Sequence, residues 1–132
     1  MLTQNQLKNK NLIRKHKFHK RSRATRLDGC PQKKGTCKKI RLTKPKKPNS
    51  AIRKVAKVKL SSGKNIVGYI PGFGHNLREY SNVLVRGGNI PDMPGVHYVL
   101  IRGKFDFSSS QHRKKRRSLY GITKEQAEKE VF

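Results

Sequence analysis

The chain has 132 residues, of which 33 are Lys or Arg and 7 are Asp or Glu, giving a formal net charge of +26 and a sequence pI near 10.9. Its length fits one small domain, and the natural counterion of so much positive charge is a polyanion, either nucleic acid or an anionic membrane surface. No apolar run approaches the roughly 18 residues of a membrane-spanning helix, and the basic stretches lack the apolar face of a surface-bound helix.

The first residues carry the signals of a short helix. Thr3 and Gln6 have the spacing of a capping box, and Leu2 and Leu7 occupy the two positions of a hydrophobic staple. Residues 14–26 are Arg-rich and free of acids, as in an organellar transit peptide. Because a segment with its own helix signals is typical of a mature chain, we expect this N-terminus to be retained.

An extended basic arm is predicted after this helix. Residues 1–47 hold 17 of the 33 Lys and Arg residues and a single acid, Asp28. Residues 8–29 have too little apolar surface to offset the entropy lost on ordering. We therefore expect this arm to be disordered in the isolated chain.

Two cysteines, Cys30 and Cys37, are separated by six residues. This spacing fits neither a disulfide framework nor the short ligand spacings of structural zinc sites. His16 and His19 could complete a set of two His and two Cys, but no closely spaced Cys pair nucleates such a site. The interpretation that we favour is two reduced thiols in a reducing compartment, with no metal and no cofactor.

The stretch KPKKPNS, from Lys44 to Ser50, is charged and contains no apolar side chain that could join a core. Each proline fixes its own φ and pushes the residue before it toward extended conformations, which disfavours a helix. Part of the conformational freedom of this loop is thus removed by its covalent structure. Such a loop is shaped before it meets a partner.

The middle of the chain has the pattern of short strands. In VAKVKL, residues 55–60, apolar side chains alternate with lysines, so one face meets the core and the other meets phosphate or water. Further strands are predicted at residues 37–43, 66–70, 82–88 and 96–103. About five short strands in roughly 70 residues predict an all-β fold, a small closed barrel of the oligonucleotide-binding (OB) type.

The C-terminal residues form two pieces of opposite character. Residues 113–117 are five consecutive cations, which fit a phosphate-binding tail better than a folded element. Thr123 and Gln126 again have capping-box spacing, and three of the seven acids lie in the short helix predicted there. Because RNA phosphate repels an acidic helix, we expect it to face protein or solvent. The predicted organisation is a helix with a basic arm, then the barrel, then the tail with its helix, over residues 1–34, 35–107 and 108–132.

No group of residues predicts catalysis. The best candidate, GHNLREY, offers His75, Asn76 and Glu79 as a base, an orienting amide and a carboxylate, but no nucleophile motif or phosphate loop supports them. We interpret this stretch as a polar turn between barrel strands whose His and Asn satisfy backbone groups. The protein is not predicted to be an enzyme.

Nucleic acid is the favoured partner, although composition alone does not choose between DNA and RNA. The chain has no Trp, and its Tyr and Phe residues are scattered, so a base-stacking platform is not evident. Recognition of the backbone is favoured instead. Long basic arms suit the spaces between RNA helices, where phosphates crowd together.

A series of motifs runs along the chain from Asn5 to Gly121: NQL, CPQKKGTC, PKKPNSAIRKVAKVKL, GHNL, VLVRGG, DMPGVHY and RSLYG. In these motifs, and in their order, the chain closely resembles the family of small-subunit ribosomal protein twelve. The resemblance implies a five-stranded OB barrel, an N-terminal extension running through the small subunit, and two loops facing the aminoacyl site. It implies as partners small-subunit rRNA, the mRNA and tRNA paired at that site and neighbouring ribosomal proteins, with no membrane and no homo-oligomer.

In that family the loop matching KPKKPNS approaches the minor groove where codon, anticodon and the monitoring adenines of the RNA meet. Pro48 and Ser50 match the positions that touch them, and a fixed hydroxyl can report minor-groove shape without reading sequence. Lys46 and Lys47 would pair with phosphate. Lys46 also matches the position where changes alter accuracy and the response to streptomycin.

The second loop, GGNIPDMPGV, departs from the family pattern. Asn89 and Pro91 stand where Arg and Lys are usual, so two phosphate contacts are lost. Asp92 and Pro94 match, and Asp92 aligns with a residue that carries a methylthio modification in many bacteria, which makes it a candidate for modification. Phe73, outside this loop, stands where Glu is usual.

The residues expected to act fall into two groups. Those of the two loops are Lys46, Lys47, Pro48, Asn49, Ser50, Asp92, Pro94 and Gly95. Those expected to bind rRNA are Lys15, Lys17, Lys20, Arg21, Arg23, Arg53, Lys54, Lys57, Lys59, Arg86, Arg113, Lys114, Lys115, Arg116 and Arg117.

The departures from the family, and a start that aligns with the family's own first residues and leaves no room for a presequence, favour an organellar or divergent bacterial version. We expect a mitochondrial ribosome, with a plastid ribosome or the bacterial cytoplasm as alternatives. The function expected is a structural constituent of the small subunit that contributes to decoding accuracy. The alternative is a free-standing OB module that binds single-stranded nucleic acid and folds without a partner.

Overall fold

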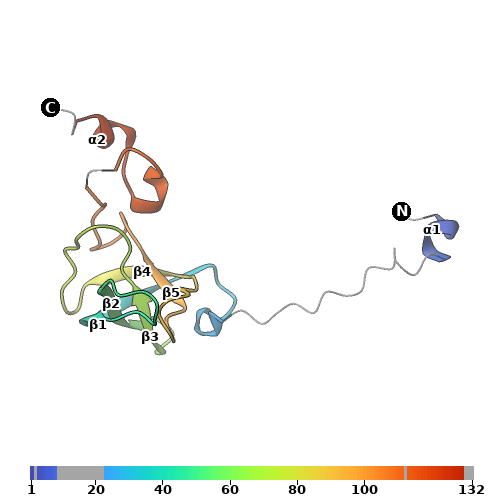
Figure 1. Ribbon diagram of the computed structural model, residues 1–132, viewed down its shortest axis with the longest axis horizontal. Helices are drawn as coiled ribbons and strands as arrows, with labels where there is room; N and C mark the ends of the chain where they lie inside the picture. The colour runs from blue at the N-terminus through green and yellow to red at the C-terminus, as the bar shows by residue number, and fades with distance from the viewer. Residues whose placement is uncertain (2, 9–22, 112, 130–132) are drawn as a thin grey trace.

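The computed structural model describes residues 1, 3–8, 23–111 and 113–129, and its centre is a closed five-stranded barrel (Figure 1). The barrel follows the order β1-β2-β3-β5-β4, with β3 and β5 parallel and all other neighbours antiparallel. The predicted all-β barrel is therefore confirmed. In chain order the elements are α1 (Gln4–Lys8), the 3-10 helix η1 (Thr25–Leu27), β1 (Gln32–Thr43), β2 (Arg53–Leu60), β3 (Asn65–Tyr69), β4 (Asn82–Gly87), β5 (Tyr98–Ile101), the 3-10 helix η2 (Arg117–Tyr120) and α2 (Lys124–Lys129).

Strand β1 is longer than the predicted residues 37–43 because it has two partners. Its first half, from Gln32 to Thr36, pairs with β4, and from Gly35 onward it pairs with β2. Where β1 changes partner, its backbone lies close to β2. A Cβ added at Gly35 would lie 2.5 Å from Val58 Cγ1. Strand β5, by contrast, is shorter than the predicted residues 96–103, because the residues before Tyr98 belong to a loop.

The alternation in β2 is as predicted. Ala56, Val58 and Leu60 are buried, whereas Lys57 and Lys59 are exposed on the outer face. The inward side chains form one core with buried residues of the other strands and of the segments before, between and after them: Leu27, Cys37, Ala56, Val58, Leu60, Ile66, Ile70, Leu77, Val83, Val85, Tyr98, Leu100 and Phe107.

The presence of Leu27 in this core corrects one expectation. The extended arm was predicted to continue through residue 29, but residues 25–27 form a 3-10 turn, and Leu27 is buried among the barrel strands. A single apolar residue in a basic stretch forms no periodic pattern from which burial could be predicted. Its role in the core appears only when it is packed against the barrel.

Both predicted capping boxes are confirmed. At the start of α1, the backbone amide of Gln6 donates to Thr3 Oγ1, and the backbone amide of Thr3 donates to Gln6 Oε1. Thr123 and Gln126 make the same reciprocal pair before α2. The staple proposed with Leu2 lies outside the described residues. No helix in the described part of the chain is long and apolar enough to cross a membrane.

The C-terminal tail is more folded than its run of cations predicts. Residues 117–120 form η2, the Ser110 amide donates to the Tyr120 carbonyl at 3.0 Å, and the Arg113 guanidinium lies 4.0 Å from the Tyr120 ring centroid. Gly121 closely approaches Gly103 of the barrel. The tail thus folds back on the barrel before α2 begins.

Candidate nucleic-acid interface

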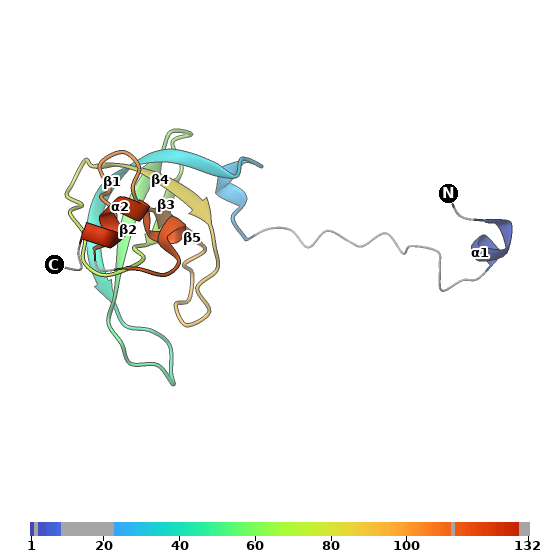
Figure 2. The same ribbon diagram turned by 90° about the horizontal axis from the view of Figure 1, so that it is seen from above.

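Two loops project from the same end of the barrel (Figure 2). The first loop, residues 44–52, joins β1 to β2, and the second loop, residues 88–97, joins β4 to β5. They meet because the end of β3 lies beside the start of β2 on one side and the start of β5 on the other, as the pairings Val55 with Tyr69 and Gly68 with Tyr98 show. The structure thereby brings together the two groups of loop residues that the sequence places about 40 positions apart.

The tip of the first loop is exposed. Residues 46–50 all face solvent, and a turn joins the Asn49 amide to the Lys46 carbonyl at 3.1 Å. The peptide bond between Lys47 and Pro48 is cis. The lysines, the proline ring and the Ser50 hydroxyl are therefore presented outward on a turned backbone.

Asp92 of the second loop contacts the first loop at two points and the start of β2 at a third. Its carbonyl accepts from the Lys46 amide at 2.7 Å, and its Oδ2 atom lies 3.5 Å from Asn49 Nδ2 and 2.6 Å from Arg53 Nη2. A hydrogen bond with Tyr69 and the charge of Asp92 raise the pKa of Arg53 above its usual value. Backbone and side-chain amide contacts thus join the two loops, and an ion pair joins the second loop to the start of β2.

The second loop has a small core of its own. Met93 and Val96 are buried with Val55, and Tyr69 and Ile90 pack against them. Successive turns join the Met93 amide to the Ile90 carbonyl at 3.2 Å and the Val96 amide to the Met93 carbonyl at 3.4 Å. Pro94 and Gly95 remain exposed. Asp92 is therefore mounted on a packed loop.

The cations predicted to bind rRNA divide by their surroundings. The guanidinium of Arg53 is paired with Asp92 within the protein. Arg117 is half-buried, and Lys15, Lys17, Lys20 and Arg21 lie outside the described residues. The following are exposed: Arg23, Lys54, Lys57, Lys59, Arg86, Arg113, Lys114, Lys115 and Arg116.

The stretch considered for catalysis is a turn, as interpreted from sequence. His75 Nδ1 accepts from the Leu77 amide at 3.2 Å, and Asn76 Oδ1 accepts from the Ser108 amide at 3.2 Å. Burial and the charges of Lys54 and Arg102 lower the pKa of His75. His75 and Asn76 thus satisfy backbone groups, which confirms that interpretation.

The two cysteines are free and differ in exposure. Cys37 is fully buried in the core and Cys30 is exposed. Within the described residues no cluster of three or more His, Cys, Asp or Glu could hold a metal ion. His16 and His19 lie outside those residues.

The fold and the surface together define a class of protein, the small cationic barrels of the OB type. Comparison with known proteins narrows the class. A family model described as ribosomal protein S12/S23 matches residues 20–129. The small ribosomal subunit protein uS12m of Acanthamoeba castellanii is 64% identical over 99 residues, which are 74% of this chain and 78% of that relative. The chain therefore belongs to the ribosomal protein S12/S23 family, as its motifs predict.

Proposed function

We propose that the protein is a structural constituent of the small subunit of the mitochondrial ribosome and that its two linked loops contribute to accurate decoding at the aminoacyl site. The family match and the likeness to a small-subunit protein, uS12m, support the structural role and the location. The proposed partners are small-subunit rRNA, neighbouring ribosomal proteins and the mRNA and tRNA paired at that site. No catalytic step is proposed.

The observation that carries the decoding role is the attachment of the first loop to Asp92. A minor groove presents ribose hydroxyls and base edges with a geometry common to all Watson–Crick pairs, so a hydroxyl in a fixed place can favour correct geometry without reading sequence. Ser50 is exposed and lies four positions after Lys46, whose backbone amide is held by the Asp92 carbonyl. The loop is thus preorganised and loses little entropy when a tRNA arrives.

Anchoring to rRNA is assigned to cations outside this loop end. Lys57 and Lys59 project from the outer face of β2, and residues 113–116 form an exposed run beside η2. Exposed cations of this kind bind phosphate and displace counterions, which makes binding depend on salt. Anchoring and decoding are therefore separable by mutation.

The decoding role is tested by Ser50→Ala in mitochondrial ribosomes. We expect lower accuracy or speed of decoding with nearly normal subunit assembly, because one exposed hydroxyl is lost and no core is disturbed. Ser62→Ala, which removes an exposed hydroxyl from the β2–β3 turn, is the matched control and should change neither quantity. Failure of Ser50→Ala subunits to assemble, or unchanged decoding, contradicts the proposal.

The anchoring role is tested by replacing the five cations of residues 113–117 with Gln. We expect weaker incorporation into small subunits that becomes worse as salt is raised, because each neutralised contact removes counterion release from binding. Decoding accuracy in the subunits that do form should change little. Normal incorporation at high salt would show that this tail does not anchor the protein.

A further inference from the structure

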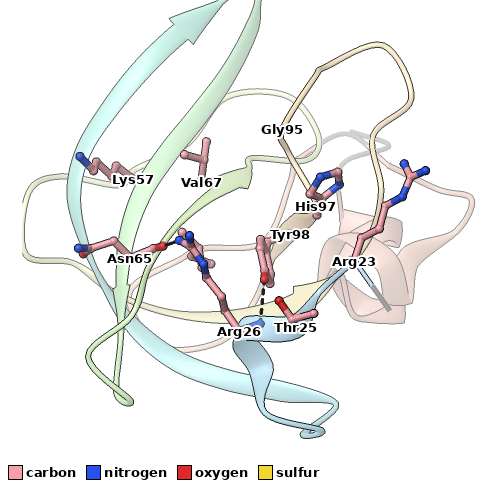
Figure 3. A pocket seen from close by; sticks show the side chains of 10 residues that line it. Arg23, Thr25, Arg26, Lys57, Asn65, Val67, Gly95, His97 and Tyr98 are labelled. Atoms are coloured by element: carbon pink, nitrogen blue, oxygen red, sulfur yellow. Dashed lines mark hydrogen bonds between the residues drawn. The ribbon is translucent and has the colours of Figure 1, made fainter. Parts of the chain in front are cut away.

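A pocket of about 490 Å³ lies where three segments meet (Figure 3). The end of the N-terminal arm contributes Arg23, Thr25 and Arg26, the outer face of β2 and β3 contributes Lys57 and Asn65, and the second loop contributes His97. The sequence predicts that Arg23 and Lys57 bind rRNA but does not bring them into one site, because the lining residues are spread over some 75 positions and form no motif.

The pocket is cationic. Arg23, Arg26 and Lys57 line it together with His97, and none of its lining residues is acidic. In a cavity walled by protein, charges of one sign raise the local concentration of the opposite ion. A pocket with this lining selects an anion.

Two of these cations are free for a ligand, and one is held in place. The Arg26 amide donates to the Tyr98 hydroxyl at 3.1 Å, and its guanidinium donates to the Asn65 carbonyl. Among the described residues, no hydrogen bond or ion pair engages the side chains of Arg23 and Lys57. Figure 3 shows these two on opposite sides of the pocket, with Arg26 and Tyr98 between them.

On the wall formed by the second loop, a ligand can come close to the backbone at Gly95. Gly95 has φ +78, and a Cβ built there would meet no atom within 4 Å. Beside it, His97 Nδ1 lies 2.9 Å from Asn89 Oδ1, which holds the imidazole at the edge of the pocket. Asn89, which replaces an expected Arg, thus orients a pocket residue.

We propose that this pocket binds a stretch of RNA phosphodiester backbone and so joins the arm, the barrel and the second loop at one contact. The proposal rests on the proposed function, since the RNA is taken to be small-subunit rRNA. Separated cations across a wide pocket fit successive phosphates of a strand better than one small anion. The occupied pocket fixes where the arm leaves the barrel.

Val67 offers a test that leaves every proposed cation in place. It lines the pocket on β3, is 37% exposed and pairs with Lys57 in the sheet. Val67→Glu places a carboxylate in the pocket, and Val67→Gln has the same size without the charge. We expect the full-length Val67→Glu chain to bind small-subunit rRNA at least tenfold more weakly than Val67→Gln near physiological salt. The difference should shrink as salt rises.

Circular dichroism of both variants checks that the barrel is retained. Equal rRNA affinities of the two variants overturn the pocket proposal while leaving the proposed function to the tests of Ser50 and residues 113–117. No rRNA binding by the wild-type chain overturns both. A nucleoside monophosphate that binds the wild-type chain saturably, is lost in Val67→Glu and is not displaced by rRNA assigns the pocket to a free nucleotide and also overturns the proposal.

Discussion

Asp92 Oδ2 lies 2.6 Å from Arg53 Nη2, and this ion pair joins the second loop to the first residue of β2. The two side chains are 14% and 31% exposed, so solvent screens their attraction only in part. The Asp92 carbonyl also accepts from the Lys46 amide, so one residue of the second loop contacts both the first loop and the start of β2.

The substitution Asp92→Asn should loosen the first loop. It keeps a side chain that can contact Asn49 but removes the charge that Arg53 requires, leaving a half-buried guanidinium without its carboxylate. We expect faster amide hydrogen exchange in residues 44–52, measured by mass spectrometry on the isolated chain.

Further variants test whether the change in exchange comes from loss of the ion pair between Asp92 and Arg53. Arg53→Gln should accelerate exchange in the same residues, and combining it with Asp92→Asn should add little, because both remove one contact. Glu79→Gln removes an exposed carboxylate elsewhere and should leave the loop unchanged. Unaltered exchange in Asp92→Asn would mean that the ion pair does not order the loop.

Arg102 is a buried cation held by backbone carbonyls. It is 4% exposed and donates to the carbonyls of Pro71, Phe73, Gly74 and Ser108, and burial lowers its pKa. Arg102→Met leaves these acceptors without a donor and should lower the free energy of unfolding by about 3 kcal/mol.

Urea denaturation of the two chains measures this loss. The exposed neighbour Lys104 provides the control, because Lys104→Met removes a cation that faces solvent and should change stability much less. Equal effects of the two substitutions would show that the guanidinium of Arg102 is not needed to hold the loop carbonyls.

Asp28 gives a pH-dependent contribution to stability. Hydrogen bonds from Lys33 and Lys64 lower its pKa from 3.8 to about 2. A carboxylate whose pKa is lowered on folding stabilises the fold above its unfolded pKa, and that contribution is lost as pH falls through the folded value. Wild type should therefore be more stable than Asp28→Asn at pH 7, and the gap should close between about pH 4 and pH 2. Urea unfolding at several pH values measures the gap, and a gap that persists at pH 2 would contradict the assignment.

The two cysteines should differ in reactivity. Burial raises the pKa of Cys37 to about 11, whereas Cys30 is exposed. Because the thiolate is the reactive form, iodoacetamide at pH 8 should modify Cys30 in the native chain and leave Cys37 intact. Peptide mass spectrometry identifies the modified residue, and unfolding in urea should make both reactive. Rapid modification of native Cys37 would show that the barrel opens.

The strands and helix caps were predictable from sequence because their signals are local. Alternation in VAKVKL and the reciprocal pairs of Thr3 with Gln6 and Thr123 with Gln126 depend on neighbours a few positions away. The five-stranded barrel followed from the number and spacing of such strands. The roles of the loop residues were predicted from the resemblance to a family.

The rest depends on contacts between distant parts of the chain. Leu27 is one apolar residue in a basic stretch, and Arg102 reads as a surface cation, yet both are buried. The attachment of Asp92 to Arg53 exists only once the barrel places two loop ends together. No spacing rule in a single sequence carries such information, because each contact is selected by packing.

The two partners of β1 have a consequence for the protein before it joins a ribosome. Because β1 pairs with β4 along one half and with β2 along the other, the described strands close on themselves and leave no unpaired edge along the barrel. An open edge would offer its amide and carbonyl groups to strands of any other unfolded chain. The newly made protein therefore associates through charge, which an RNA partner can satisfy, and resists the strand exchange that leads to aggregation.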